Sequence, residues 1–264
     1  MKTLKYNYLV EVQFLGFRFH GWQTQANHKT VQETILTILQ KIFPEKKPKI
    51  QGSSRTDSMV SAEHYLLMLT IDAEIEVIMP PLEFESLFND LLPADIKFLR
   101  IKKMEPHFNI IQSPKLKEYH YYFSFGDEKP HPFCAPILTH IKRNLNLDLM
   151  KQGADTFIGT HQFKSYCYRP SKDKNLEKNI LHCSIEQNTV YTANFFPKYS
   201  FYIKVIGHSF VRHQIRLMAG TLFRLGLGEI SLEEVQESLK GNSFNCIGFL
   251  APASGLVLRN IEFE

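Results

Sequence analysis

The order in which strand patterns and helix patterns follow one another is the feature that most constrains this chain. Residues 8–14 alternate apolar and polar side chains, which is typical of a strand with one buried face. Residues 30–43 carry apolar side chains at helical spacing, and Thr30 and Glu33 form a T-x-x-E capping box at the start. The continuous apolar run 64–71 predicts a strand that is buried on both faces. A second helix and a third strand are then predicted over residues 82–92 and 96–104.

The second half of the chain repeats this alternation of elements. Its side-chain patterns predict strands over residues 118–125 and 200–207, a short helix over residues 148–159 and a longer helix over residues 211–225. Gly226-Leu227-Gly228 would end that last helix. The chain is therefore expected to have an α+β fold with two related α/β subdomains.

The two subdomains are expected to form one catalytic unit. We place the N-terminal subdomain at residues 1–106 and the C-terminal subdomain at residues 107–264, with a junction near residues 105–113. The chain of 264 residues is long enough for this arrangement to contain a full core.

Composition excludes several other classes of protein. Hydrophobic residues make up 44% and charged residues 22%, which is ordinary for a globular protein, and a net charge of +4 permits a nucleic-acid partner without requiring one. The four cysteines are scattered with no C-x-x-C pair, so a disulfide framework is not expected. Because there is no apolar signal core and no membrane-length apolar run, we expect a cytoplasmic protein that does not enter a membrane.

The stretch 53–62, SSRTDSMVSA, places Arg55 and Asp57 two residues apart in a run of small polar residues. One interpretation is a surface turn in which both side chains are solvated, because exposed ion pairs are common and contribute little to stability. The alternative is a functional loop. The stretch alone does not decide between them.

A second unusual segment, residues 164–178, interleaves basic residues with Tyr166 and Tyr168 and shows no core periodicity. It is either a solvated loop or a loop that faces RNA, since basic groups neutralise phosphates and tyrosines stack on bases. The lysines expected to contact phosphates in the second case are Lys172, Lys174 and Lys178.

The loop after the first strand is the alternative place for an RNA contact. It contains Phe17, Arg18, His20 and Trp22, and so combines a cation with aromatic rings that can stack on bases. Histidines elsewhere do not indicate a metal site. His208 and His213 are five residues apart, which does not put two ligands on one helix face.

Several spaced segments together resemble the tRNA pseudouridine synthase A family, over nearly the whole chain from Tyr8 to Leu258. Each of these segments is a weak signal alone, and their common order makes the resemblance specific. They are GFRFHGWQTQ followed by TVQE, RTD, FNDLLPADI, GTHQFKSY, GHSFVRHQIRLMAGTLFRLGLG and APASGLVL.

The resemblance gives the stretch around Asp57 a chemical meaning. In that family the aspartate of this loop is the catalytic carboxylate of a reaction that breaks the C1′–N1 bond of a uridine, turns the uracil and rejoins it through C5. A carboxylate can add to uracil C6 or act on the sugar, and both routes stay open. The family's F-x-x-x-x-x-R-x-x-x-G segment matches Phe210 to Gly220 and implies that Arg216 keeps Asp57 ionised in a water-excluding pocket.

The resemblance also implies roles for three further residues. The tyrosine at the position of Tyr119 lies against the target uracil and assists removal of the C5 proton. Arg55 assists base flipping, which costs a few kcal/mol of stacking energy. Leu256 corresponds to an apolar residue that lines the pocket.

The chain departs from the family pattern at several positions. Ser54 and Met59 replace glycines around Asp57, so the loop backbone must differ if either position needs a positive φ. The other substitutions leave the catalytic set intact and alter the surface that reads RNA. They are Ser61 for a histidine, Asn109 for a histidine, Ile111 for an arginine, Gln162 for an aspartate, Lys178 for an arginine and Ser254 for a histidine.

The resemblance implies a pseudouridine synthase fold in which the antiparallel sheets of two subdomains meet at a central catalytic cleft. It further implies a homodimer that binds tRNA and isomerises uridine in the anticodon arm without metal or organic cofactor. Two alternatives stay open. One is a synthase that acts on a different RNA, and the other is an RNA-binding paralogue that has lost catalysis.

Overall fold

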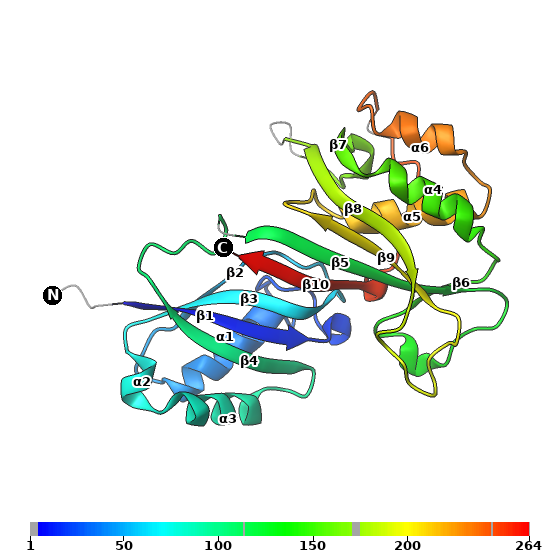
Figure 1. Cartoon of the computed structure of the whole chain (residues 1–264). Coiled ribbons are helices and arrows are strands. Elements are labelled where there is room, and N and C mark those ends of the chain that lie inside the picture. The colour runs from blue at the N-terminus through cyan, green and yellow to red at the C-terminus, as the bar shows by residue number, and fades with distance from the viewer. Residues whose placement is uncertain (1–4, 113, 171–174, 244, 264) are drawn as a thin grey trace. The chain divides into compact units, whose positions relative to one another are not determined.

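The computed structural model describes residues 5–112, 114–170, 175–243 and 245–263 (Figure 1). The chain divides into two compact units. The first unit contains residues 1–115 and 260–264, and the second contains residues 116–259. The subdomain boundary expected at residue 106 lies inside the first unit, and as a domain boundary it stays a prediction.

The sheet of the first unit is antiparallel. Its strands are β1 (Tyr6–Phe14), β2 (Lys49–Gly52), β3 (Ser61–Ile71) and β4 (Ile96–Met104). β1 lies between β4 and β3, and β2 pairs with the other edge of β3. β3 is buried along most of its length, as its apolar sequence predicted.

Helices of the first unit pack together beside this sheet (Figure 1). They are α1 (Val31–Ile42), α2 (Ile75–Ile78) and α3 (Pro81–Leu91). The predicted N-cap of α1 is confirmed, because the Thr30 side chain accepts a hydrogen bond from the Glu33 backbone N–H. A cluster of aromatic rings fills the space between α3 and β4. Its members are Phe43, Phe84, Phe88 and Phe98.

The second unit is also built on mainly antiparallel strands. Its strands are β5 (Pro114–Phe125), β6 (Thr139–Ile141), β7 (Gly159–Gln162), β8 (Glu177–Gln187) and β9 (Phe201–Gly207). They run in the order β5-β9-β8-β7, and the short β6 pairs in parallel with the end of β5. The last strand, β10 (Leu256–Phe263), begins in the second unit and ends in the first.

The helices of the second unit are α4 (Leu147–Thr156), α5 (Gln214–Gly226) and α6 (Leu232–Ser238). Figure 1 shows them gathered on one side of strands β8 and β9. α4 packs against α5 and α6, and α5 is buried over most of its circumference. The mainly antiparallel strands with packed helices confirm the predicted α+β class.

Some boundaries differ from the sequence-based expectations for physical reasons. The last long helix was expected from residue 211, but it begins at Gln214 because His213 has a φ of 62° and cannot belong to a right-handed helix. Tyr166, expected in an open loop, is fully buried. Among the described residues, no helix has the length and hydropathy needed to cross a membrane.

Candidate active site

The loop that carries Asp57, residues 53–60, connects β2 to β3. Its start is fixed where the Ser53 N–H donates to the Leu66 carbonyl at 2.9 Å, and where the Tyr65 hydroxyl donates to the Ser54 carbonyl. Its end is a turn, because the Val60 N–H donates to the Asp57 carbonyl at 3.2 Å. Both ends of the loop are therefore held in a defined conformation.

The loop after β1 lies directly against the Asp57 loop. The Met59 N–H donates to the Phe19 carbonyl at 3.0 Å, and the Trp22 N–H donates to the Thr56 carbonyl at 3.2 Å. Gly21 makes this approach possible. Its φ is 87°, and a Cβ there would lie 2.6 Å from the Thr56 carbonyl oxygen. The two motifs seen in the sequence thus form one hydrogen-bonded structure.

Met59 has a φ of 67°, which is in the left-handed region. Left-handed backbone costs a non-glycine residue about 1–2 kcal/mol. Ser54 is not among the described residues with positive φ. Of the two glycine replacements, only Met59 therefore occupies a position for which glycine is suited, and the chain keeps a left-handed residue there.

The side chains of the Asp57 loop differ in exposure. Asp57 is half-buried, whereas Arg55 is exposed. In the part of the chain that the structure describes, no carboxylate pairs with the Arg55 guanidinium. Arg55 is therefore available to a partner outside the chain.

The predicted RNA-contact residues of the loop after β1 are not equally accessible. Arg18 is exposed and forms an ion pair with Asp95, with an Nε–Oδ2 distance of 2.7 Å. The exposed His20 ring lies 4.4 Å from the ring of His28. Trp22 is only 2% exposed and packs on the Tyr65 ring, with centroids 4.3 Å apart. Trp22 therefore supports the Asp57 loop and presents almost no ring surface for stacking on a base.

Tyr119 lies near the start of β5 in the second unit, opposite Val205 of β9. It is 8% exposed, and the Phe210 ring meets it edge-on at a centroid distance of 5.3 Å. The next tyrosine on the same strand face, Tyr121, donates its hydroxyl hydrogen to the Pro252 carbonyl at 2.8 Å. Burial raises the pKa of Tyr121 well above its ordinary value, so this hydroxyl stays neutral.

Arg216 lies in the first turn of α5 and is half-buried. Its Nε donates to the Ala251 carbonyl at 2.7 Å, and the Ala251 N–H donates back to the Arg216 carbonyl at 3.3 Å. The segment before β10 can approach α5 so closely because residue 220 is glycine. A Cβ on Gly220 would lie 1.8 Å from the Phe249 carbonyl oxygen. Arg216 and Gly220 therefore both contribute to the contact between α5 and the segment before β10. This contact orients the Arg216 guanidinium.

Leu256 is 6% exposed and begins β10, directly after the 3₁₀ turn Ala253–Gly255. Within the second unit, hydrogen bonds link the segments that carry the predicted site residues Tyr119, Arg216 and Leu256. Tyr119 shares β5 with Tyr121, which bonds to Pro252, and Ala251 bonds to Arg216. The pairing of Asp57 with Arg216 stays a prediction.

The predicted basic loop is only partly described. Lys172 and Lys174 lie outside the described residues, and Lys178 is a half-buried residue of β8 that pairs with His161 of β7. Tyr166 does not face solvent, and its hydroxyl lies 2.7 Å from Ser238 Oγ. The interpretation of Tyr166 as a base-stacking residue was therefore wrong, because the side chain is part of the core.

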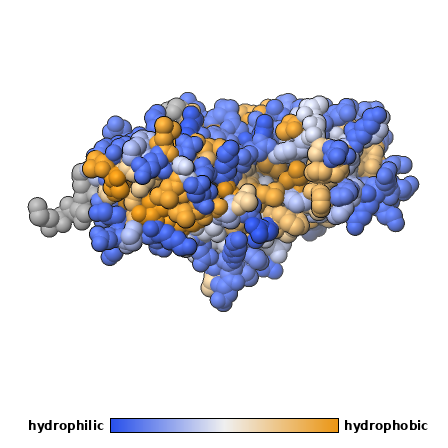
Figure 2. All heavy atoms as spheres, turned by 90° about the horizontal axis from the view of Figure 1, so that it is seen from below, coloured by the Kyte–Doolittle hydropathy of each residue, from blue (hydrophilic) through white to orange (hydrophobic). Residues whose placement is uncertain are grey.

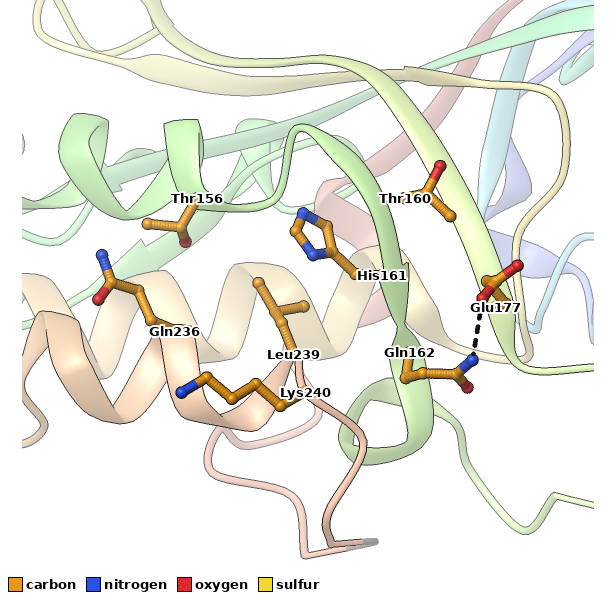
Figure 3. Close-up of a pocket in the computed structure, with 8 residues that line it drawn as sticks. All are labelled: Thr156, Thr160, His161, Gln162, Glu177, Gln236, Leu239 and Lys240. Atoms are coloured by element: carbon orange, nitrogen blue, oxygen red, sulfur yellow. Dashed lines mark hydrogen bonds between the residues drawn. The ribbon is translucent and has the colours of Figure 1, made fainter.

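A pocket of about 350 Å³ lies beside β7 (Figure 3). The side chain of Gln162 donates to Glu177 at 3.1 Å across its edge. Gln162 stands where the resembled family has an aspartate, and an aspartate here would place two carboxylates side by side. Glutamine at position 162 therefore avoids the repulsion with Glu177 that an aspartate would cause. The pocket is lined by Thr156, Thr160, His161, Gln162, Glu177, Gln236, Leu239 and Lys240.

The described residues contain no group of three or more histidine, cysteine or acidic side chains that could hold a metal ion. Two further residues matter for the site's construction. Ser61, noted in the sequence only as a replacement for a histidine, accepts a hydrogen bond from the Gly16 N–H at 2.9 Å. Tyr65, which no local pattern distinguishes from an ordinary strand residue, supports both loops.

Comparison with known proteins gives the class of this chain. Residues 154–264 match a family model described as tRNA pseudouridine synthase. This part of the chain includes Arg216 and Leu256. The match indicates a pseudouridine synthase, and the mainly antiparallel strands with packed helices are consistent with the fold of that class.

Relatives that match nearly the whole chain give the particular family. A tRNA pseudouridine synthase A from Thermoanaerobacter sp. (strain X514) is 30% identical over 97% of this chain and 99% of its own length. A tRNA pseudouridine synthase A 2 from Bacillus thuringiensis subsp. konkukian (strain 97-27) is 29% identical over the same shares. The chain belongs to the tRNA pseudouridine synthase A family, a family of isomerases. The resemblance seen in the sequence is thereby confirmed.

Proposed function

We propose that this protein isomerises uridine to pseudouridine in the anticodon arm of tRNA, with Asp57 as the catalytic carboxylate. The observation that carries the proposal is the Asp57 loop. Hydrogen bonds from neighbouring segments hold it, and it keeps a left-handed residue two positions after Asp57. The printed names of the full-length relatives support tRNA as the substrate.

The reaction needs few groups, because it is an isomerisation. Asp57 either adds to uracil C6 or acts on the ribose, and the C1′–N1 bond breaks. The uracil then turns, and C5 forms the new bond to C1′. The proton that leaves C5 is balanced by the proton that N1 gains, so no redox partner or cofactor is required. Removal of metal ions with EDTA should leave the rate unchanged.

The remaining site residues have supporting roles in this proposal. Arg216 pairs with Asp57 and favours its ionised form. Tyr119, which is buried, lies against the uracil and assists removal of the C5 proton. The exposed Arg55 compensates for the stacking that the nucleotide gives up when it leaves the RNA stack. Leu256 contributes an apolar wall.

A map of pseudouridine in total RNA, made with and without the gene, tests the proposal. We expect the loss of pseudouridine at one or more tRNA anticodon-arm positions and its return with the wild-type gene but not with Asp57→Asn. Loss in another RNA would show a synthase with a different substrate. An unchanged map would indicate an RNA-binding paralogue.

We further propose that the protein acts in the cytoplasm as a homodimer. An exposed apolar surface over α2 and α3 supports a contact with a second copy (Figure 2). Val77 and Leu82 are 79% and 81% exposed, and the other members are Ile78, Leu87 and Leu91. The double variant Val77→Asp/Leu82→Asp should be monomeric by light scattering with an unchanged melting temperature. A dimeric double variant would exclude this surface as the interface.

A further inference from the structure

A group of cationic and aromatic side chains lies at the N-terminal end of α5, and we call it the Tyr168 cluster. It consists of Tyr168, Arg169, Arg212 and His213. The guanidinium carbons of Arg169 and Arg212 lie 5.1 and 5.3 Å from the centroid of the Tyr168 ring. The His213 ring stacks on the same tyrosine at 4.9 Å with an interplanar angle of 23°. One exposed tyrosine thus orders two arginines.

The backbone builds this cluster from two segments that are distant in sequence. The Tyr168 N–H donates to the Arg212 carbonyl at 3.1 Å, which fixes the two segments side by side. Arg169 and His213 both have left-handed backbone, with φ of 47° and 62°. Such conformations are costly for non-glycine residues and persist only where the surroundings hold them. The arrangement is therefore a defined structure and not a chance meeting of solvated side chains.

The guanidinium groups of Arg169 and Arg212 have no carboxylate partner among the described residues. Other exposed arginines form ion pairs, such as Arg143 with Glu229 and Arg100 with Glu11. Two adjacent guanidinium groups repel each other, and an anionic partner would remove that repulsion.

The place of the cluster connects it to the proposed active site. Arg212 precedes Arg216 by four residues, and His213 is the N-cap residue of α5. Tyr168 follows the 3₁₀ turn Phe163–Tyr166, and the last residue of this turn, Tyr166, is fully buried. A ligand on Arg212 would thus be bound four residues along the chain from the arginine proposed to pair with Asp57.

We propose that the Tyr168 cluster binds the sugar–phosphate backbone of unpaired nucleotides in the RNA substrate. The two guanidinium groups contact phosphates, and the Tyr168 ring holds them in place. This inference rests on the proposed function. It replaces the assignment of RNA contact to Tyr166 and adds two arginines that the sequence motifs did not single out.

The test uses the full chain, an unmodified tRNA transcript and binding titrations at several salt concentrations. Removing one phosphate contact should lower the magnitude of the slope of log K against log[salt] by about 0.7 for a single strand. At 0.1 M salt this corresponds to about fivefold weaker binding per arginine. The double variant Arg169→Gln/Arg212→Gln should therefore bind about 25-fold more weakly, with a slope smaller in magnitude by about 1.4.

A matched control separates a specific contact from a general decrease in positive charge. Arg143→Gln removes an exposed arginine of the same unit that is already ion-paired. We expect this variant to bind tRNA with nearly wild-type affinity and slope. Tyr168→Phe should also bind normally, because it keeps the ring, whereas Tyr168→Ala should weaken binding.

Two results would overturn the inference while leaving the proposed function intact. The first is an active wild-type enzyme whose double arginine variant matches Arg143→Gln in affinity and slope. The second is weaker binding with an unchanged salt slope, which would mean a structural effect and not a phosphate contact. If the wild-type chain forms no pseudouridine in RNA, the proposed function itself fails. Melting temperatures of all variants show whether they are folded.

Discussion

The left-handed backbone at Met59 allows a quantitative test of how the Asp57 loop is built. Met59→Gly and Met59→Ala both remove the half-buried side chain, so the difference between them isolates the backbone. Glycine relieves a strain of about 1–2 kcal/mol that alanine retains. Glycine also loses about 0.5–1 kcal/mol more conformational free energy on folding than alanine. At the midpoints of these two ranges, Met59→Gly should be more stable than Met59→Ala by about 0.75 kcal/mol.

Urea denaturation of the two variants measures this difference as a shift in midpoint at constant m-value. Ser54 supplies the matched control, because it replaces the other glycine of the family pattern and is not among the residues with positive φ. There the sign should reverse, with Ser54→Ala more stable than Ser54→Gly by about 0.5–1 kcal/mol. Equal stability of the two Met59 variants, or a more stable alanine variant, would refute the reasoning.

Three further predictions concern the site and its supports. Arg216→Ala should remove most pseudouridine formation in a single-turnover assay, and Arg216→Lys should not restore it because lysine lacks the planar guanidinium fork; an active lysine variant would contradict this. Trp22→Ala should lower the free energy of unfolding by about 3–5 kcal/mol in urea titrations, and a decrease below about 1 kcal/mol would show that the buried ring does not support the loop. Neutralising Lys172, Lys174 and Lys178 together should weaken tRNA binding and lower the magnitude of the salt slope, and unchanged binding would make this segment a solvated surface.

Elements with a strong side-chain period could be predicted from the sequence. The alternation in β1 and β9 and the helical spacing in α1 gave their positions to within a few residues, and Thr30 marked the start of α1. No side-chain pattern in the sequence was interpreted as a strand at the positions of β8 and β10. Both owe their conformation to neighbouring chain segments, which a local pattern does not reveal.

The candidate site could be predicted only in part for a related reason. The Arg55-Thr56-Asp57 motif and Arg216 were indicated by the resemblance to the family, but their supports depend on contacts between distant segments. Trp22 illustrates this, because an aromatic residue beside a cation suggested base stacking and the folded chain buries it on Tyr65. The Tyr168 cluster likewise forms only when two loops meet.

The central claim is that Asp57 is the carboxylate that isomerises uridine in tRNA. The most direct measurement incubates purified wild-type and Asp57→Asn protein with an unmodified tRNA transcript, and follows pseudouridine formation and tRNA affinity in the same preparations. The account predicts product with the wild-type protein and none with Asp57→Asn, while both bind tRNA with similar Kd because phosphate contacts carry the binding. Turnover by Asp57→Asn within about tenfold of wild type, which corresponds to a barrier change below about 1.4 kcal/mol, would contradict it.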